Sequence, residues 1–290
     1  MRARAFCPGH ITGFFEICRT DNLLASGSRG GGLCTSLGAT SEVSIEKADR
    51  LEIDISIDGE SREAEVTQAA LGHLLGEGER HVSVSTRLDL PESQGFGMSA
   101  AGALSACIAA SHILGISIQK AFEATHVAEI ECGTGLGDVP AIHRAGITIR
   151  ELPGLPPTGR VHRVEEAPEI VLAVVGPPIK TSEILADVEL ARRINRGGAE
   201  RVTQLLSRPT VNDLMRLASS FTLETDLASE RVIAAMDAAS AAGVASMVML
   251  GNSVFAIGRT EELVDILSAF GEVKSCSVDS AGARVLPNQT

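Results

Sequence analysis

The sequence predicts an α+β fold in two domains. Its 290 residues exceed one domain of average size, about 150 residues. Strands and helices are mixed in the first half, and the second half has the order strand, helices, strand, strand, helix, strand. That order is typical of a ferredoxin-like domain with extra helices in its first crossover.

The elements of the first half follow from the spacing of apolar side chains. Residues 51–57 alternate strictly between apolar and polar side chains, which is the period of a half-buried strand. Two further strands are predicted at residues 81–90 and 147–150. Helices are predicted at about residues 63–76, 95–114 and 118–131.

The second half begins after a proline-rich segment. Strands are predicted at residues 170–175, 246–250, 254–257 and 273–278, with a tight turn between the middle two. Helices are predicted at about residues 182–206, 210–223, 229–242 and 261–269. Pro153, Pro156 and Pro157 form the clearest linker, so we divide the chain into domains at 1–157 and 158–290.

The chain is acidic, with 37 Asp and Glu against 25 Lys and Arg and a net charge of -12. Nucleic acids are bound mainly by Lys and Arg that neutralise phosphates, and the chain has no Trp or Tyr to stack on bases. We therefore expect no nucleic-acid partner. Small anionic substrates remain compatible with this charge, because a binding site is governed by its local charges.

One uncharged segment is long enough to span a bilayer. Residues 93–119 contain no Asp, Glu, Lys or Arg, but they are mostly Ala, Gly and Ser and include His112. We expect a buried helix there and no membrane association. The six cysteines form no Cys-x-x-Cys pair and no secretory signal is recognised, which favours a cytoplasmic protein with reduced thiols.

The most informative segment is Leu-Pro-Glu-Ser-Gln-Gly-Phe-Gly-Met-Ser-Ala-Ala at residues 90–101. A strand leads to two glycines, and a helix begins directly after them. Such glycines let backbone N–H groups approach a phosphate, and the helix N-terminus adds unpaired donors and partial positive charge. Ser99 lies at that terminus, where its hydroxyl can cap the helix or bind a metal.

Further candidate residues surround the loop at 133–138. His126 and Glu129 are three residues apart and share one helical face. Asp138 ends the loop, whose alternating glycines let backbone approach a ligand. These carboxylates could serve as a metal ligand and a general base. The alternative is that Glu129 is solvated and Asp138 caps the next element.

These segments resemble the GHMP kinase family. Residues 8–16 match its first motif, a Pro-Gly-Lys stretch ending in Gly-Glu. The wider segment 5–16 combines a turn with an apolar stretch, which alone means little. Residues 91–101 match its Pro-x-x-x-Gly-Leu-Gly-Ser-Ser-Ala-Ala phosphate loop, with Phe96 and Met98 as replacements. Residues 249–253 stand where a glycine-rich motif is expected. The resemblance implies a two-domain GHMP-kinase fold with a ferredoxin-like C-terminal domain.

Within the family, three patterns are similar to the archaeal pantoate kinases. They are Pro-x-His-Ile-Thr-x-Phe-Phe, Gly-Ser-x-Gly-x-Gly and Met-x-Gly-Asn-[ST]-Val-Phe. The resemblance implies Mg²⁺-dependent transfer of the ATP γ-phosphoryl group to (R)-pantoate, giving 4-phosphopantoate for coenzyme A synthesis. It also implies a homodimer.

The resemblance assigns roles to individual residues. It implies a catalytic set of Asp138, Ser99 and Glu129, the last two holding Mg²⁺. ATP binding is implied for Pro91, Gly95, Phe96, Gly97, Met98, Ser99, Ala100 and Ala101. Pantoate binding is implied for His10, Ser28, His126, Arg150 and Thr181. Many GHMP kinases have Lys at the position of His10.

Other functions remain open at this point. The acceptor could be homoserine or mevalonate, or the chain could be a kinase-like ligand sensor without turnover. A sensor has no need of the catalytic carboxylate at Asp138. Gly-Met-Ser-Ala-Ala also resembles a relaxed nucleophile elbow, with Asp138 and His143 in hydrolase order, although Ala101 replaces its second glycine.

Overall fold

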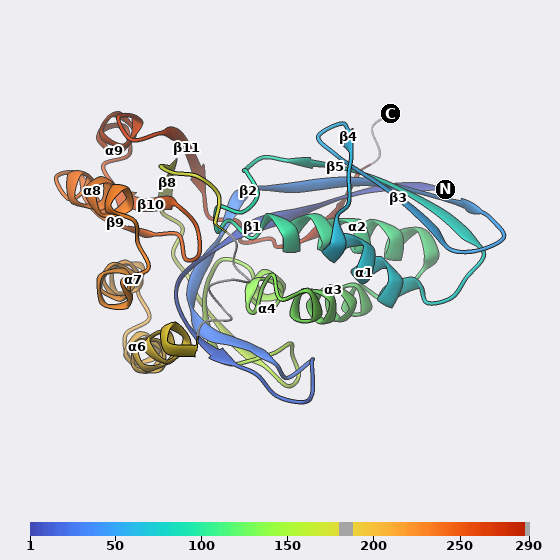
Figure 1. Cartoon of the computed structure of the whole chain (residues 1–290), viewed down its shortest axis with the longest axis horizontal. Helices are drawn as coiled ribbons and strands as arrows, with labels where there is room; N and C mark the ends of the chain where they lie inside the picture. The colour runs from blue at the N-terminus through green and yellow to red at the C-terminus, as the bar shows by residue number, and fades with distance from the viewer. Residues whose placement is uncertain (180–187, 288–290) are drawn as a thin grey trace.

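The computed structural model describes residues 1–179 and 188–287, which form two sheets covered by helices (Figure 1). The strands are β1 (Arg2–Cys18), β2 (Gly27–Lys47), β3 (Glu52–Ile57), β4 (Glu60–Ser61), β5 (Arg80–Leu88), β6 (Ile147–Leu152), β7 (Arg160–Val164), β8 (Glu169–Val174), β9 (Gly243–Met247), β10 (Ser253–Gly258), β11 (Glu272–Ser277) and β12 (Arg284–Leu286). The helices are α1 (Glu65–Leu75), α2 (Met98–Leu114), α3 (Ile118–Cys132), α4 (Asp138–Arg144), α6 (Val188–Ser207), α7 (Val211–Thr225), α8 (Glu230–Ala239) and α9 (Thr260–Ser268). The predicted α+β class is confirmed.

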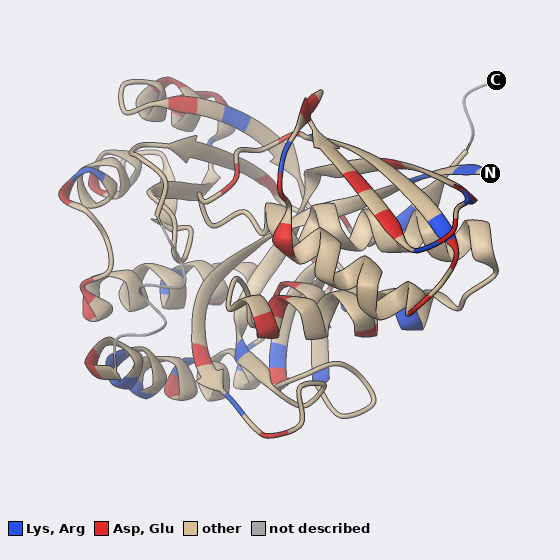
Figure 2. Ribbon diagram, turned by 45° about the vertical axis from the view of Figure 1, so that its right-hand side comes forward, with Lys and Arg blue, Asp and Glu red and all other residues tan. Residues whose placement is uncertain are grey.

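Helix α2 lies at the centre of the N-terminal half. The larger sheet has the order β12-β1-β2-β5-β3-β4, with β6 paired to the start of β2 and β7 paired to β6. Helix α2 packs on β1 and β2 and is covered on its other side by α1 and α3 (Figure 1). It is buried almost all round, which explains why no charged residue interrupts it (Figure 2). Across residues 1–179 and 188–287, no helix is long and apolar enough to cross a membrane.

The smaller sheet confirms the predicted ferredoxin-like arrangement. Its strand order is β11-β8-β10-β9, and every neighbouring pair is antiparallel. Helices α6, α7 and α8 lie in the crossover from β8 to β9, and α9 lies in the crossover from β10 to β11. These elements group at one end of the molecule (Figure 1).

The two longest strands, β1 and β2, were not predicted. Strand β1 packs between α2 on one face and α6 and α7 on the other, so most of its side chains are buried on both faces. A strand buried on both faces shows no alternation of apolar and polar residues. The turn expected within residues 5–16 is part of this strand. Helix α4 and strands β4, β7 and β12 are also additional to the prediction. The domain boundary at 157/158 stays a prediction.

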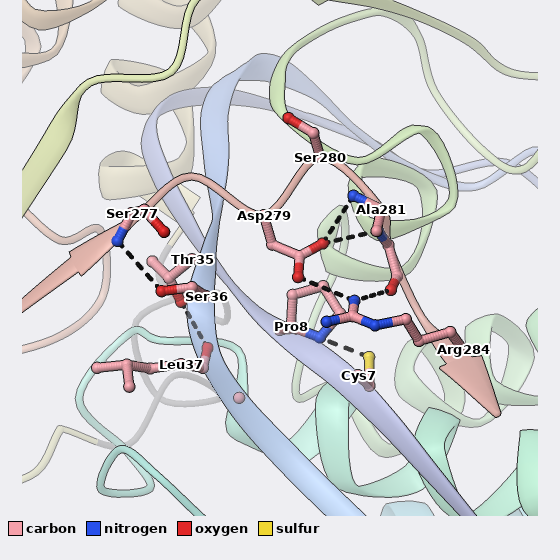
Figure 3. Close-up of polar contacts among 12 residues, drawn as sticks. Cys7, Pro8, Thr35, Ser36, Leu37, Ser277, Asp279, Ser280, Ala281 and Arg284 are labelled. Carbon is pink, nitrogen blue, oxygen red and sulfur yellow. Dashed lines mark hydrogen bonds and ion pairs between the residues drawn. The ribbon is translucent and has the colours of Figure 1, made fainter. Parts of the chain in front are cut away.

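The segment after β11 returns to the larger sheet, where β12 pairs with β1 (Figure 3). Asp279 is buried there, and its carboxylate accepts hydrogen bonds from the backbone N–H groups of Ala281 and Gly282 at 3.0 and 2.7 Å. Arg284 donates to the same carboxylate at 2.9 Å. A paired and hydrogen-bonded buried charge of this kind fixes the path of the chain.

Replacing a helical glycine with alanine is expected to have opposite effects on stability at two positions. A Cβ on Gly198 in α6 would overlap the backbone carbonyl of Phe15, whereas a Cβ on Gly72 in α1 would meet nothing within 4 Å. We expect Gly72→Ala to raise the free energy of unfolding by about 0.5–1 kcal/mol, from helix propensity alone. Gly198→Ala should lower it by about 1–3 kcal/mol, because β1 and α6 must separate. Urea denaturation measures both, and a stabilised Gly198→Ala protein would contradict this packing.

Candidate active site

A cavity of about 340 Å³ lies where the two halves of the chain meet. Its lining brings together residues that the sequence predicted to be catalytic or to bind ATP or pantoate. They come from β2, from the segment before α2 and from the α3–α4 region. These are Ser28, Gly95, Phe96, Gly97, Met98, Ser99, Glu129 and Asp138. Three residues predicted to bind ATP are not part of the lining. Pro91 is exposed, and Ala100 and Ala101 are buried in the packing of α2.

The glycine loop, residues 95–99, delivers the start of α2 to this cavity. Gly97 is the N-cap residue, with φ of 66°, and no side chain caps this helix end. Ser99 is therefore the second residue of the helix rather than its cap, and its side chain lines the cavity. The first N–H groups of a helix have no partner within it, so this end presents donors and partial positive charge. A phosphate group fits such a site.

The glycine loop is fixed by contacts with both halves of the chain. The backbone N–H of His10 in β1 donates to the carbonyl of Phe96 at 3.0 Å. Gln94, which is 3% exposed, donates from Nε2 to the carbonyl of Gly176 at 2.9 Å and accepts at Oε1 from the hydroxyl of Ser253 at 3.1 Å. Gln94 was not predicted as a functional residue, and its local sequence gives no sign of these partners.

Two carboxylates meet at the α3–α4 loop. Glu129 lies near the end of α3 and is 2% exposed, while Asp138 begins α4 and is partly open to the cavity. A Cβ on Gly135 would come within 2.6 Å of Oε1 of Glu129, so a glycine lets the loop cross this carboxylate closely. Burial, reinforced by the charge of Asp138, raises the pKa of Glu129 well above its usual value.

The donor set at this position fits Mg²⁺. No hydrogen bond to the Glu129 carboxylate is present in residues 1–179 and 188–287, although the group is nearly fully buried. The Ser99 hydroxyl lines the same cavity. Within the described ranges no cluster of three or more His, Cys, Asp or Glu side chains could form an all-protein metal site. Mg²⁺ prefers oxygen ligands and usually completes its shell with water and substrate phosphates, so one carboxylate and one hydroxyl suit it.

Asp138 is paired with His10 and not with His143. Its Oδ1 lies 2.6 Å from Nδ1 of His10, which is fully buried in β1. The ring of His143 instead packs edge-on against Phe122, with ring centroids 4.8 Å apart. The Ser99–Asp138–His143 arrangement of a hydrolase is therefore not formed, because the carboxylate binds a different histidine.

The residues predicted to bind the acceptor lie at different depths. Ser28 lines the cavity, whereas Arg150 is 1% exposed and lies behind Gly137. A Cβ on Gly137 would come within 2.7 Å of Nε of Arg150. This Nε has no hydrogen-bond partner among the described residues. Burial lowers the pKa of Arg150 to about 10, so the guanidinium stays charged at neutral pH.

His126 does not line the cavity. Its Nε2 donates to the carbonyl of Ser26 at 3.0 Å, next to the start of β2. Burial lowers its pKa, so a neutral ring supports the backbone that carries Ser28.

Thr181 lies outside the described residues. Thr12, Leu136 and Met249 line the cavity but were not predicted, although Thr12 follows His10 by two residues in the N-terminal motif.

Comparison with known proteins identifies the family. Residues 64–146 match the GHMP kinases N terminal domain. The pantoate kinase of Methanocaldococcus jannaschii is 31% identical over 276 residues, which cover 94% of this chain and 99% of that protein. The chain belongs to the GHMP kinase family. The resemblance predicted from its motifs is thereby confirmed.

Solved structures agree with this GHMP kinase fold. A phosphotransferase related to the CoA biosynthesis pathway is 28% identical, with a TM-score of 0.88 over 98% of each chain. A homoserine kinase from Cytophaga hutchinsonii has a TM-score of 0.69 at 14% identity, covering 98% of this chain and 97% of that one. This second likeness shows the fold alone.

The raised pKa of Glu129 predicts how pH affects the stability of the metal-free kinase. An acid whose pKa is raised by folding holds its proton more tightly in the native state, so its ionisation costs stability as pH rises. We expect Glu129→Gln to raise Tm relative to wild type at about pH 8, with the difference vanishing near pH 4. Thermal unfolding in EDTA measures this effect, with the exposed Glu77→Gln as control. A Tm of Glu129→Gln below wild type at pH 8 would contradict the electrostatic assignment.

Proposed function

We propose that this GHMP kinase transfers the γ-phosphoryl group of ATP to the primary hydroxyl of (R)-pantoate, giving 4-phosphopantoate for coenzyme A synthesis. The near full-length similarity to a pantoate kinase supports the choice of acceptor. The observation that carries the chemistry is the position of Asp138 beside the glycine loop. Its carboxyl carbon lies 3.3 Å from where a Cβ on Gly97 would be. A carboxylate therefore lies next to the helix end that fits a phosphate.

A second cavity provides a place for the nucleoside. This cavity of about 180 Å³ shares Glu92, Met98, Ser99 and Thr134 with the main one and extends along the start of α1. Its other lining includes the apolar side chains of Ile57 and Val66. A base and ribose placed there would put the triphosphate across the glycine loop, with its terminal phosphate in the main cavity.

Mg²⁺ held by Ser99 and Glu129 would neutralise charge on the transferring phosphates. The chain itself supplies alignment and hydrogen-bond donors. The N–H groups at the start of α2 bind phosphate oxygens, and the glycine loop positions them through its contacts with β1 and the smaller sheet. Phosphoryl transfer depends mainly on such positioning and charge stabilisation.

The acceptor combines a carboxylate, two hydroxyls and a dimethyl-substituted carbon. Phe15 and Leu136 offer apolar contacts in the main cavity, and Ser28 offers a hydroxyl. Arg150, whose Nε is unpaired behind Gly137, is the cation that suits the carboxylate. The primary hydroxyl would then lie at Asp138, which orients it and accepts its proton as the bond to phosphorus forms.

We further propose that the enzyme is cytoplasmic and forms a homodimer, the latter by analogy with its family. All six cysteines are free thiols, as expected in a reducing compartment.

The acceptor assignment predicts that ADP release from Mg-ATP requires pantoate and is absent with mevalonate or homoserine. A coupled assay with each acceptor measures this directly. If a screen of hydroxy compounds finds turnover only with an acceptor other than pantoate, the assignment of pantoate as the substrate is wrong. Binding of pantoate and ATP without any ADP release would instead favour a ligand sensor.

The role of Asp138 predicts a separation of binding from chemistry. Asp138→Asn should lower kcat by about 10²–10⁴-fold, because the amide cannot accept the hydroxyl proton. The affinity for Mg-ATP, measured by calorimetry, should be nearly unchanged. Asp237→Asn, at an exposed position in α8, is the matched control and should retain wild-type kcat. Near-normal turnover in Asp138→Asn would rule out this role.

A further inference from the structure

His10 connects three elements of the GHMP kinase although it does not line the cavity. Its ring is 0% exposed and comes from β1. Nδ1 lies 2.6 Å from Oδ1 of Asp138 at the start of α4. On the other side of the ring, Nε2 lies 3.4 Å from NH1 of Arg150, which comes from β6. Both ring nitrogens therefore have polar partners on elements far apart in the sequence.

The glycine-rich start of β2 makes this chain of contacts possible. Strand β2 lies between β1 and β6, so His10 and Arg150 must meet across it. A Cβ on Gly32 would come within 2.8 Å of Nε2 of His10, and a Cβ on Gly30 within 2.9 Å of NH2 of Arg150. Larger residues at these two positions would occupy the space where the two side chains meet.

The partners of the ring fix which nitrogen carries its proton. A guanidinium can only donate hydrogen bonds, so Nε2 of His10 accepts from Arg150. Nδ1 is then the protonated nitrogen, and it donates to Oδ1 of Asp138. A ring protonated on both nitrogens would place an N–H against the N–H of Arg150.

We propose that His10 is a positioning residue for phosphoryl transfer, whose Nδ1–H holds Oδ1 of Asp138 so that Oδ2 faces the acceptor hydroxyl. This role rests on the proposed function. The side chain of Asp138 is 21% exposed, so one oxygen can be held by the buried ring while the group still reaches the cavity. Arg150 acts behind the ring by keeping Nε2 an acceptor.

The electrostatic surroundings agree with a neutral ring. Burial lowers the pKa of His10, and the hydrogen bond to Asp138 only partly opposes this. The nearby charge of Arg150 lowers the pKa further. The ring therefore donates one directed hydrogen bond to Asp138 without adding a second buried cation beside the guanidinium.

Two substitutions of similar polarity separate this role from simple packing. The side-chain amide of Asn places a donor near the position of Nδ1, whereas that of Gln places one near Nε2. We expect His10→Gln to lower kcat by about 100-fold, as for a misplaced catalytic group, with KM for ATP and pantoate little changed. His10→Asn should recover most of that loss. Equal loss of kcat in both variants, or a raised KM at unchanged kcat, would overturn the proposal.

The tautomer can be measured without activity. In protein labelled with ¹⁵N-histidine, the signals missing from the His10→Asn spectrum belong to His10. We expect Nδ1 to be its protonated nitrogen in ligand-free wild type, and an Nε2-protonated ring would overturn the proposal even if His10→Gln fails to fold. Wild-type protein without pantoate-dependent ADP release would refute the proposed function but leave this tautomer result standing.

Discussion

The site depends on the close backbone contact between the glycine loop and both halves of the chain. A Cβ on Gly95 would come within 2.7 Å of the Met249 carbonyl, and one on Gly251 would overlap the Gln94 carbonyl. On the opposite side, β1 holds the loop through the His10 N–H. Glycines are required at these contacts because any Cβ would separate the surfaces. The start of α2, with the N–H groups that we propose bind phosphate, is therefore placed by two sheets together.

The negative charge of the chain extends to the main cavity, and this restricts how anionic substrates can bind there. The protein carries a net charge of -12, and its main cavity is lined by Glu92, Glu129 and Asp138, with no Lys or Arg among the described lining residues. Two anionic substrates can enter such a cavity only if positive charge is supplied locally. The start of α2 supplies part of it, Arg150 lies directly behind the lining, and Mg²⁺ would supply the rest. Burial raises the pKa of Glu129, so we expect its ionised form to reduce stability when no metal is bound.

The features that were correctly predicted from the sequence are those set by the spacing of residues close together in the chain. The glycine loop, the face shared by His126 and Glu129, and the ferredoxin-like order all depend on residues close together in the chain, and the structure contains the loop, the helix and the strand order. Strand β1 and the glycine-rich first half of β2 could not be found in the same way, because burial on both faces removes alternation. The second half of β2 does alternate in burial over residues 40–47, and the prediction missed that signal. The partners of Gln94 were hidden for a related reason: they lie in the other half of the chain, where no local pattern points to them.

The presence of His10, at a position where the resemblance to GHMP kinases implies lysine, fits the same long-range geometry. Arg150 already brings one fully buried guanidinium to this position, and Asp138 is the acidic side chain that hydrogen-bonds the His10 ring among the described residues. A lysine would add a second cation in the same low-dielectric space, whose desolvation a single carboxylate would not offset. A neutral imidazole instead accepts from the guanidinium and donates to the carboxylate, so one buried cation and one partly exposed anion suffice. The glycines of β2 are the structural condition for this exchange, because only they leave room for the ring and the guanidinium to meet.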